Sequence, residues 1–126
     1  VPTGYLVPSA ITVLVVEDEP LFRMNIADQL QDLGFDVLKA ANARDAVTML
    51  LANDDIRLMF TDVDMPGGMD GLKLAATVRD RWPPIKIIVT SRLRQIFLNE
   101  LPDESRFFKK PCIGVAVTSA MREMLA

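Results

Sequence analysis

Short apolar runs and segments of helical periodicity alternate along this chain, and this alternation constrains the fold more than any other feature. Residues 11–16 form a nearly continuous β-branched run, as expected of a strand that is covered on both faces. Similar runs occupy residues 56–61 and 85–89. Segments with helical spacing lie between these runs and are joined to them by short connections. The pattern predicts a parallel sheet with helices on both faces.

The remaining segments extend this pattern to five strand–helix units. Residues 35–39 alternate between apolar and polar side chains, which is typical of an edge strand, and residues 107–108 mark a brief fifth strand. A candidate fourth helix near residues 93–101 lacks a clear cap or apolar stripe, so we expect it to be short or irregular. The other predicted helices span residues 20–33, 42–53, 70–81 and 113–125. The first of them carries an apolar stripe of Leu21, Met24, Ala27, Leu30 and Leu33.

Length and composition exclude several classes of protein. The 126 residues suffice for one domain, which we assign to residues 11–126, and half of them are apolar. The net charge of −3, with both signs interspersed, argues against a nucleic-acid surface. The chain has no histidine, which excludes an imidazole base, and its single cysteine excludes an internal disulfide and fits a reducing cytoplasm. No apolar run approaches the roughly 20 residues that a membrane-spanning helix needs.

The first ten residues, VPTGYLVPSA, are predicted to form a flexible N-terminal tail. They lack the basic start and the long apolar stretch of a signal peptide. The chain does not begin with methionine, which suggests processing or excision from a longer protein.

Acidic residues follow two of the predicted strands at the point where each strand ends. The segment VLVVEDEP leads into Glu17 and Asp18, and the segment MFTDVDMPGG leads into Asp62. Because ligands of an open parallel sheet gather at the carboxyl ends of its strands, we expect these acids to meet if the two strands are neighbours. Three carboxylates close together repel and raise one another's pKa, and a divalent cation relieves this repulsion. An all-oxygen ligand set favours Mg²⁺.

A hydroxyl and an ammonium group follow the fourth and fifth strands. Thr90 ends the fourth strand, and Lys110 comes directly before Pro111 after the fifth. A metal beside a carboxylate, with a hydroxyl and an ammonium converging on it, is suited to phosphoryl transfer. The carboxylate itself can be the nucleophile and form an aspartyl phosphate.

Four segments together resemble the signature of response-regulator receiver domains of two-component signalling, including the chemotaxis regulators. They are VLVVEDEP, FTDVDMPGGMDG, IIVTS and FFKKP, in that order, and the likeness extends over residues 11–126. The resemblance implies a doubly wound α/β fold, a flavodoxin-like (βα)₅ sandwich with a parallel sheet of strand order 2-1-3-4-5. The family carries no enzymatic activity beyond promoting its own phosphorylation and dephosphorylation.

The resemblance also implies roles for individual residues around one Mg²⁺ ion. Asp62 matches the phospho-accepting aspartate and a metal ligand. Asp18 matches a direct metal ligand, and Glu17 matches an acid that acts through bound water. The backbone carbonyl of Asp64 matches the third protein ligand.

Other matching residues would bind the phosphoryl group or report its presence. Thr90 matches the switch hydroxyl, and Lys110 matches the lysine that pairs with the phosphoryl group. Phe107 falls where receivers carry a rotating aromatic side chain. The bond between Lys110 and Pro111 matches one that the family holds cis.

The function implied is a phosphorylation-activated switch that accepts a phosphoryl group from a phosphohistidine onto Asp62. Its partners would be a sensor histidine kinase or histidine phosphotransfer protein and an unknown downstream protein, with no direct contact to nucleic acid or membrane. The expected location is the cytoplasm, and homodimerisation is left open. The sequence does not distinguish a stand-alone receiver from a receiver within a longer protein.

The sequence departs from the family pattern in two places, and two alternative functions stay open. An extra glycine lies between Pro66 and Asp70, and the segment between Thr90 and Lys110 is short and places Arg92 and Arg94 near the site. One alternative is a receiver-like interaction module that signals without phosphorylation. The other is a phosphatase of the haloacid-dehalogenase type, whose D-x-D motif the segment 62–64 matches.

Overall fold

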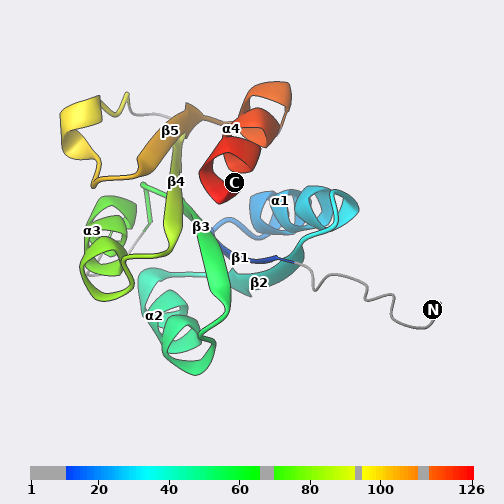
Figure 1. Ribbon diagram of the computed structural model, residues 1–126, viewed down its shortest axis with the longest axis horizontal. Helices are drawn as coiled ribbons and strands as arrows, with labels where there is room; N and C mark the ends of the chain where they lie inside the picture. The colour runs from blue at the N-terminus through cyan, green and yellow to red at the C-terminus, as the bar shows by residue number, and fades with distance from the viewer. Residues whose placement is uncertain (1–10, 66–69, 93–94, 111–113) are drawn as a thin grey trace.

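The computed structural model describes residues 11–65, 70–92, 95–110 and 114–126. Five strands, four α-helices and one short 3₁₀ helix follow one another within these ranges (Figure 1). The strands are β1 Thr12–Val16, β2 Asp36–Ala40, β3 Ile56–Asp62, β4 Lys86–Ser91 and β5 Ser105–Lys109. The helices are α1 Pro20–Asp32, α2 Ala43–Ala52, α3 Gly71–Arg81 and α4 Val115–Leu125, and the 3₁₀ helix is η1 Leu98–Glu100.

The strands form one parallel sheet in the order β2-β1-β3-β4-β5, which confirms the predicted flavodoxin-like topology. β2 lies at one edge, as its alternating sequence indicates, while β1, β3 and β4 are buried. The register pairs Val16 of β1 with Thr61 of β3, and Asp62 of β3 with Thr90 of β4. The ends of three central strands therefore lie side by side at the carboxyl edge.

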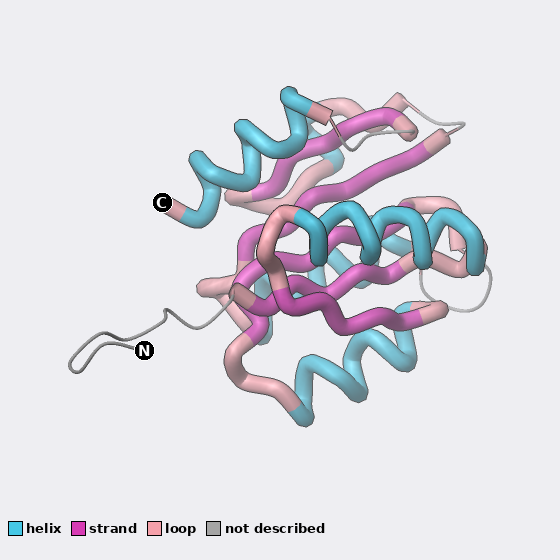
Figure 2. Tube along the Cα trace, turned by 90° about the vertical axis from the view of Figure 1, so that its right-hand side faces the viewer, coloured by secondary structure: helices cyan, strands magenta, loops and turns pink. Residues whose placement is uncertain are grey.

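Helices cover both faces of the sheet and create two separate apolar cores. The views in Figures 1 and 2 place α1 and α4 on one side of the sheet and α2 and α3 on the other. On the α1/α4 side, Val13, Leu30, Phe60 and Met121 belong to one buried cluster. On the opposite side, Leu14, Leu50, Met59 and Leu74 belong to the second. The alternating side chains of β1 and β3 contribute to both, as expected of strands covered on both faces.

The caps of the helices follow the sequence signals. Pro20 occupies the first turn of α1, where its missing N–H costs no hydrogen bond, and Glu19 accepts a hydrogen bond from the N–H of Leu21 at 3.2 Å. Asn42 caps α2 through the N–H of Asp45, and Asp70 caps α3 through the N–H of Lys73. No helix in these described ranges is long and apolar enough to cross a membrane.

The predicted stripe of α1 is partly wrong. Leu21 is 70% exposed, Met24 is 51% exposed, and Leu33 is also exposed beyond the last turn. The helix buries Ala27 and Leu30 of the predicted stripe, together with Ile26. The predicted stripe began at Leu21, the first apolar residue of the helix. The buried face is rotated about the helix axis relative to the side on which Leu21 lies.

The connection between β4 and β5 holds the short 3₁₀ helix η1 in the place of the expected fourth helix, which confirms the irregularity. Arg79 of α3 anchors this connection, because its guanidinium donates to the backbone carbonyls of Asp103 at 2.6 Å and Glu104 at 3.4 Å. Glu104, which has a φ of 57°, also pairs with Lys86 at 2.7 Å. Hydrogen bonds from the Arg79 side chain to main-chain carbonyls thus hold this connection, where the sequence predicts a fourth helix.

Candidate functional site

The three acids predicted to meet do converge at the carboxyl edge of the sheet. Asp62 is the last residue of β3, and Glu17 and Asp18 directly follow β1. One carboxylate oxygen from each lies within 4.8 Å of the others. Asp62 is 5% exposed and Glu17 is 1% exposed, whereas Asp18 is half-buried. The adjacency of β1 and β3 in the sheet produces this cluster.

Glu17 is held by hydrogen bonds on both sides of its carboxylate. Its Oε2 accepts the N–H of Glu19 at 3.1 Å, and its Oε1 pairs with the ammonium group of Lys110. Its backbone is fixed as well, because its N–H donates to Ala40 of β2 and its carbonyl accepts from Arg23 of α1 at 2.8 Å. Hydrogen bonds to its backbone and to its carboxylate therefore both hold Glu17 in place at the site.

Lys110 lies between two of the acids and is 6% exposed at its side chain. Its Nζ contacts Glu17 and lies 3.4 Å from Oδ1 of Asp62. The backbone N–H of Lys110 donates to the carbonyl of Ser91, which ties the end of β5 to the end of β4. The structure thus brings together the lysine and the acids that the sequence predicts, with Glu17 as the nearer partner of Lys110.

Burial raises the pKa of the Asp62 carboxyl, opposed mainly by the nearby charge of Lys110. Burial likewise raises the pKa of Glu17, and the hydrogen bond from Lys110 opposes this shift. Repulsion by Asp62 adds to the raised pKa of Glu17, but it is a smaller cause than burial. The expected repulsion therefore contributes to the pKa of Glu17, and for both acids the loss of water is the larger cause of the raised pKa.

Thr90 is buried beside Asp62 on the neighbouring strand. Its hydroxyl donates to the carbonyl of Thr61 at 3.4 Å. This weak, long hydrogen bond leaves little to break if the hydroxyl rotates towards another acceptor. The strand register alone determines that Thr90 lies next to Asp62.

Asp64 is exposed at the mouth of the site, and its carboxylate accepts a hydrogen bond from the buried hydroxyl of Ser91 at 2.8 Å. The predicted role of its backbone carbonyl as a metal ligand stays a prediction. Phe107 is half-buried and packs against the core on the α2/α3 side of the sheet. Its predicted rotation likewise stays a prediction.

The site opens as a pocket of about 230 Å³ that contains both acids and cations. Phe22, from the first turn of α1, contributes the only aromatic side chain among the described residues that line it. The other lining residues are Glu17, Asp18, Glu19, Asp62, Asp64, Arg92 and Lys110. The placement of Arg92 near the site agrees with the sequence, whereas Arg94, the extra glycine before Asp70 and the Lys110–Pro111 bond involve residues outside the described ranges.

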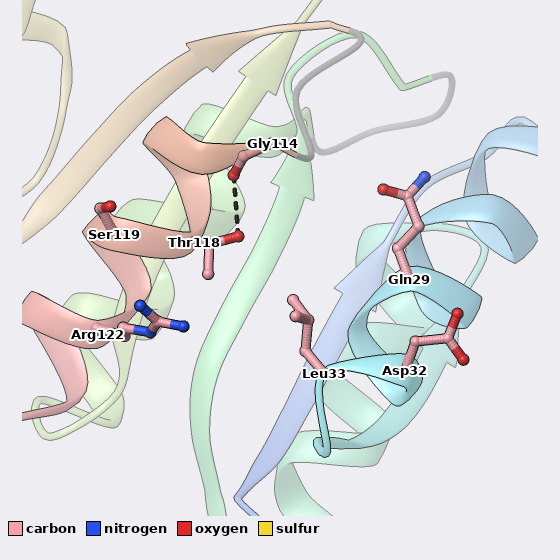
Figure 3. A pocket seen from close by; sticks show the side chains of 7 residues that line it. All are labelled: Gln29, Asp32, Leu33, Gly114, Thr118, Ser119 and Arg122. Atoms are coloured by element: carbon pink, nitrogen blue, oxygen red, sulfur yellow. Dashed lines mark hydrogen bonds between the residues drawn. The ribbon is translucent and has the colours of Figure 1, made fainter.

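A separate pocket of about 490 Å³ lies between the end of α1 and the start of α4 (Figure 3). Asp32 lines it from α1, Leu33 lines it from the position just after that helix, and Arg122 lines it from α4. Thr118, on the same wall, donates to the carbonyl of Gly114 at 2.9 Å. The pocket shares no lining residue with the acidic cluster, so it is not part of the candidate site.

The acidic cluster fits a hard divalent cation. Its donor atoms are all carboxylate oxygens, two of the acids are almost fully buried, and the third is half-buried and accessible from the pocket. Hard cations such as Mg²⁺ prefer oxygen ligands and complete their coordination with water. Glu17, Asp18 and Asp62 are therefore residues that could hold such an ion.

Sequence reasoning missed Phe22, the hydrogen bond between Ser91 and Asp64, and the role of Gly71. The position of Phe22 in the first helical turn after the acids is a signal that could have drawn attention to it. Gly71 at the start of α3 lies against the backbone of Asp62, and its N–H donates to the carbonyl of Val63 at 3.0 Å. Only the three-dimensional approach of α3 to β3 reveals that contact.

Comparisons with known proteins agree with the fold. A sensor kinase, CckA of Brucella abortus (strain 2308), is 33% identical over 118 residues, which cover 90% of this chain and 12% of the kinase. The sensor histidine kinase RcsC of Escherichia coli (strain K12) is 40% identical over 76 residues, which cover 60% of this chain and 8% of the kinase. The chain thus spans only a small part of these relatives.

Solved structures show the same architecture. A response regulator receiver protein from Sinorhizobium medicae WSM419 superposes with a TM-score of 0.84 at 24% identity, covering 92% of this chain and 94% of that one. The receiver domain of the hybrid histidine kinase CckA has a TM-score of 0.77 at 27% identity, covering 91% and 99%. The family model of the response regulator receiver domain matches residues 13–100, which is more than half of the chain. This chain therefore belongs to the response regulator receiver domain family.

Proposed function

We propose that this receiver is a switch that takes a phosphoryl group from a phosphohistidine onto Asp62. The observation that carries the proposal is the convergence of Asp62 with two further acids and Lys110 in one pocket at the carboxyl edge. Asp62 is fixed at the end of a buried central strand, with its carboxylate in that pocket. Its burial at the end of that strand favours attack from a defined direction.

In the proposed reaction, a carboxylate oxygen of Asp62 attacks the phosphorus atom. The bond between phosphorus and the histidine nitrogen breaks, and the electron pair stays on the departing imidazole. A Mg²⁺ ion held by Asp18 and Asp62, with Glu17 acting through water, would neutralise the phosphoryl oxygens. Lys110 lies close enough to Asp62 to pair with an oxygen of the transferred group.

The switch would operate through Thr90 and the connection that follows β4. The Thr90 hydroxyl has only a 3.4 Å hydrogen bond to Thr61, so a nearby phosphoryl oxygen would be a stronger acceptor. Rotation of Thr90 towards that oxygen would shift a pre-existing equilibrium between two arrangements of the neighbouring surface. We propose that this surface includes η1 and β5. We also propose that the Phe107 side chain rotates when Thr90 does.

The partners follow from the relatives, two of which are sensor kinases. We propose that a histidine kinase or a phosphotransfer protein supplies the phosphoryl group in the cytoplasm and that a further protein binds the switched surface. Nothing in the charge pattern points to nucleic acid or membrane. The family assignment favours a phosphorylated switch over the phosphatase alternative. The experiment below distinguishes the phosphorylated switch from an interaction module that signals without phosphorylation.

The test is to incubate the protein with Mg²⁺ and acetyl phosphate and to measure its intact mass beside that of Asp62→Asn. We expect one added phosphoryl group in the wild type, no addition without Mg²⁺, and none in the variant. Asp64→Asn is the matched control, since it changes a second acid of the same pocket and keeps Asp62. Labelling that persists in Asp62→Asn would overturn the assignment of the acceptor, and a wild type that gains no mass would favour the module that signals without phosphate.

A further inference from the structure

Phe22 makes an unusual contact at the mouth of the Asp62 pocket, because two cations lie against its ring. The Nζ of Lys110 is 4.8 Å from the ring centroid, and the Cζ of Arg92 is 5.6 Å from it. Both distances lie within the range in which a cation is attracted to the π system. The ring comes from α1, and the cations come from the segments that follow β5 and β4.

The environment makes the Lys110 contact the stronger of the two. The Lys110 side chain is 6% exposed, so water screens its attraction to the ring poorly, while Arg92 is exposed. Cation–π attraction grows when the cation is desolvated. One ring thus contributes to placing a buried ammonium group and a solvent-facing guanidinium group around a single pocket.

Lys110 needs such support because its nearer carboxylate partner is Glu17 and not the proposed acceptor. Its ammonium group pairs with Glu17, while Asp62 Oδ1 is 3.4 Å away. To neutralise a phosphoryl group on Asp62, the ammonium group must shift from one oxygen to another within the pocket. The ring of Phe22 is a contact that does not depend on which oxygen the ammonium group faces.

We propose that Phe22 is a positioning residue for phosphoryl transfer, whose ring holds Lys110 and Arg92 at the pocket so that both face an incoming phosphoryl group. This inference rests on the proposed function. It adds to the proposed machinery a side chain that neither binds the metal nor touches phosphorus. Arg92 becomes a second cation near the reacting group, held at the pocket by the same ring.

The experiment compares Phe22→Leu, which removes the π system and keeps apolar bulk, with Phe22→Tyr, which keeps the ring. Phe97→Leu is the control, because Phe97 is exposed and does not line the pocket. The rate of Asp62 phosphorylation by acetyl phosphate is measured by intact mass at saturating Mg²⁺. Magnesium affinity and the NMR shifts of the Lys110 ε-methylene protons, which a nearby ring displaces, are measured on the same samples.

We expect Phe22→Leu to be phosphorylated about 3- to 10-fold more slowly, the size expected for losing cation–π contacts of partly buried groups. Phe22→Tyr and Phe97→Leu should stay within about twofold of the wild type. The Lys110 shift should change in Phe22→Leu only, and Mg²⁺ affinity should remain that of the wild type. Adding Arg92→Gln should reduce the effect of Phe22→Leu, because one of the two supported cations is already gone.

Several outcomes would overturn the inference. A Phe22→Leu rate equal to that of the wild type, or a loss matched by an equal loss of Mg²⁺ affinity, would show that the ring does not position the cations. A Phe22→Tyr variant as slow as Phe22→Leu would show that bulk or packing matters instead. If the wild type itself gains no mass, the proposed function fails and this inference fails with it. If the wild type is labelled but Phe22→Leu is labelled equally fast, only this inference fails.

Discussion

Asp62 carries its charge at a place that water reaches poorly. It is 5% exposed, and its burial raises its pKa although Lys110 lies nearby. The folded protein therefore holds a proton on this carboxyl more tightly than the unfolded chain does. The stability from this group is fully present below the ordinary pKa of an aspartate and is lost as the pH rises through the raised value. At neutral pH the charge of the proposed acceptor destabilises the fold.

In the absence of divalent cations, Asp62→Asn should increase the free energy of unfolding at pH 7 by on the order of 1 kcal/mol, because it removes the buried charge. The melting temperature should rise by a few degrees. The gain should shrink as the pH falls and the wild-type carboxyl takes up its proton. Thermal melts between pH 7 and pH 4 measure this, with the exposed Asp28→Asn as control. A gain of the same size at every pH would contradict the role of the buried charge.

At the scale of elements, the start of α3 controls where β3 ends. A Cβ atom on Gly71 would overlap the carbonyl oxygen of Asp62 and lie 2.7 Å from its carbonyl carbon and 2.8 Å from Cα of Val63. These contacts are all with backbone atoms, which cannot rotate away as a side chain can. The absence of a side chain at Gly71 therefore lets α3 pack directly behind the proposed acceptor.

Gly71→Ala should destabilise the protein by about 2–4 kcal/mol, because either α3 or the end of β3 must move. It should also slow phosphorylation of Asp62 in the protein that remains folded. Denaturant unfolding and intact-mass labelling measure the two effects. Gly114→Ala is the matched control, since nothing lies within 4 Å of a Cβ at that position. If both variants were equally stable, the close packing behind Asp62 would not be required.

At the scale of the whole molecule, the acidic cluster joins the ends of two central strands. Asp18 follows β1, Asp62 ends β3, and these two strands are paired neighbours in the middle of the sheet. The unfolded chain has no such cluster, because the two residues are far apart in sequence. A cation that binds the cluster must therefore stabilise the entire fold.

Adding Mg²⁺ should raise the melting temperature, with a stabilisation of about 2.7 kcal/mol when the free ion is at 100 times its dissociation constant. Asp18→Asn should weaken Mg²⁺ binding in calorimetry and remove most of this rise. A sodium salt at the same ionic strength is the control for general screening. An Asp18→Asn variant that is stabilised as much as the wild type would place the ion elsewhere.

Much of the fold and of the site could be predicted because both follow from local patterns. The apolar runs predict the buried strands, and the rule that ligands gather at strand ends predicts the meeting of Asp18 with Asp62. The buried face of α1 could not be predicted, because apolar side chains occur on several of its faces. The sequence also could not predict that Glu17 is the nearer partner of Lys110, or that the ring of Phe22 contacts Lys110, since these residues meet only through tertiary packing. The backbone carbonyl of Asp64 and the rotation of Phe107 stay predictions.

The ion pair between Glu17 and Lys110 has a consequence for the order of events. The Glu17 carboxylate forms an ion pair with Lys110, and it is also one of the three acids of the cluster that could hold a metal ion. A divalent ion that draws on this carboxylate competes with the ammonium group and loosens it. The freed ammonium group can then face a phosphoryl group on Asp62, so binding of the metal and binding of the phosphodonor are thermodynamically linked, and each should strengthen the other. The receiver would behave as a coincidence detector, responsive to a phosphodonor only when magnesium is already in place.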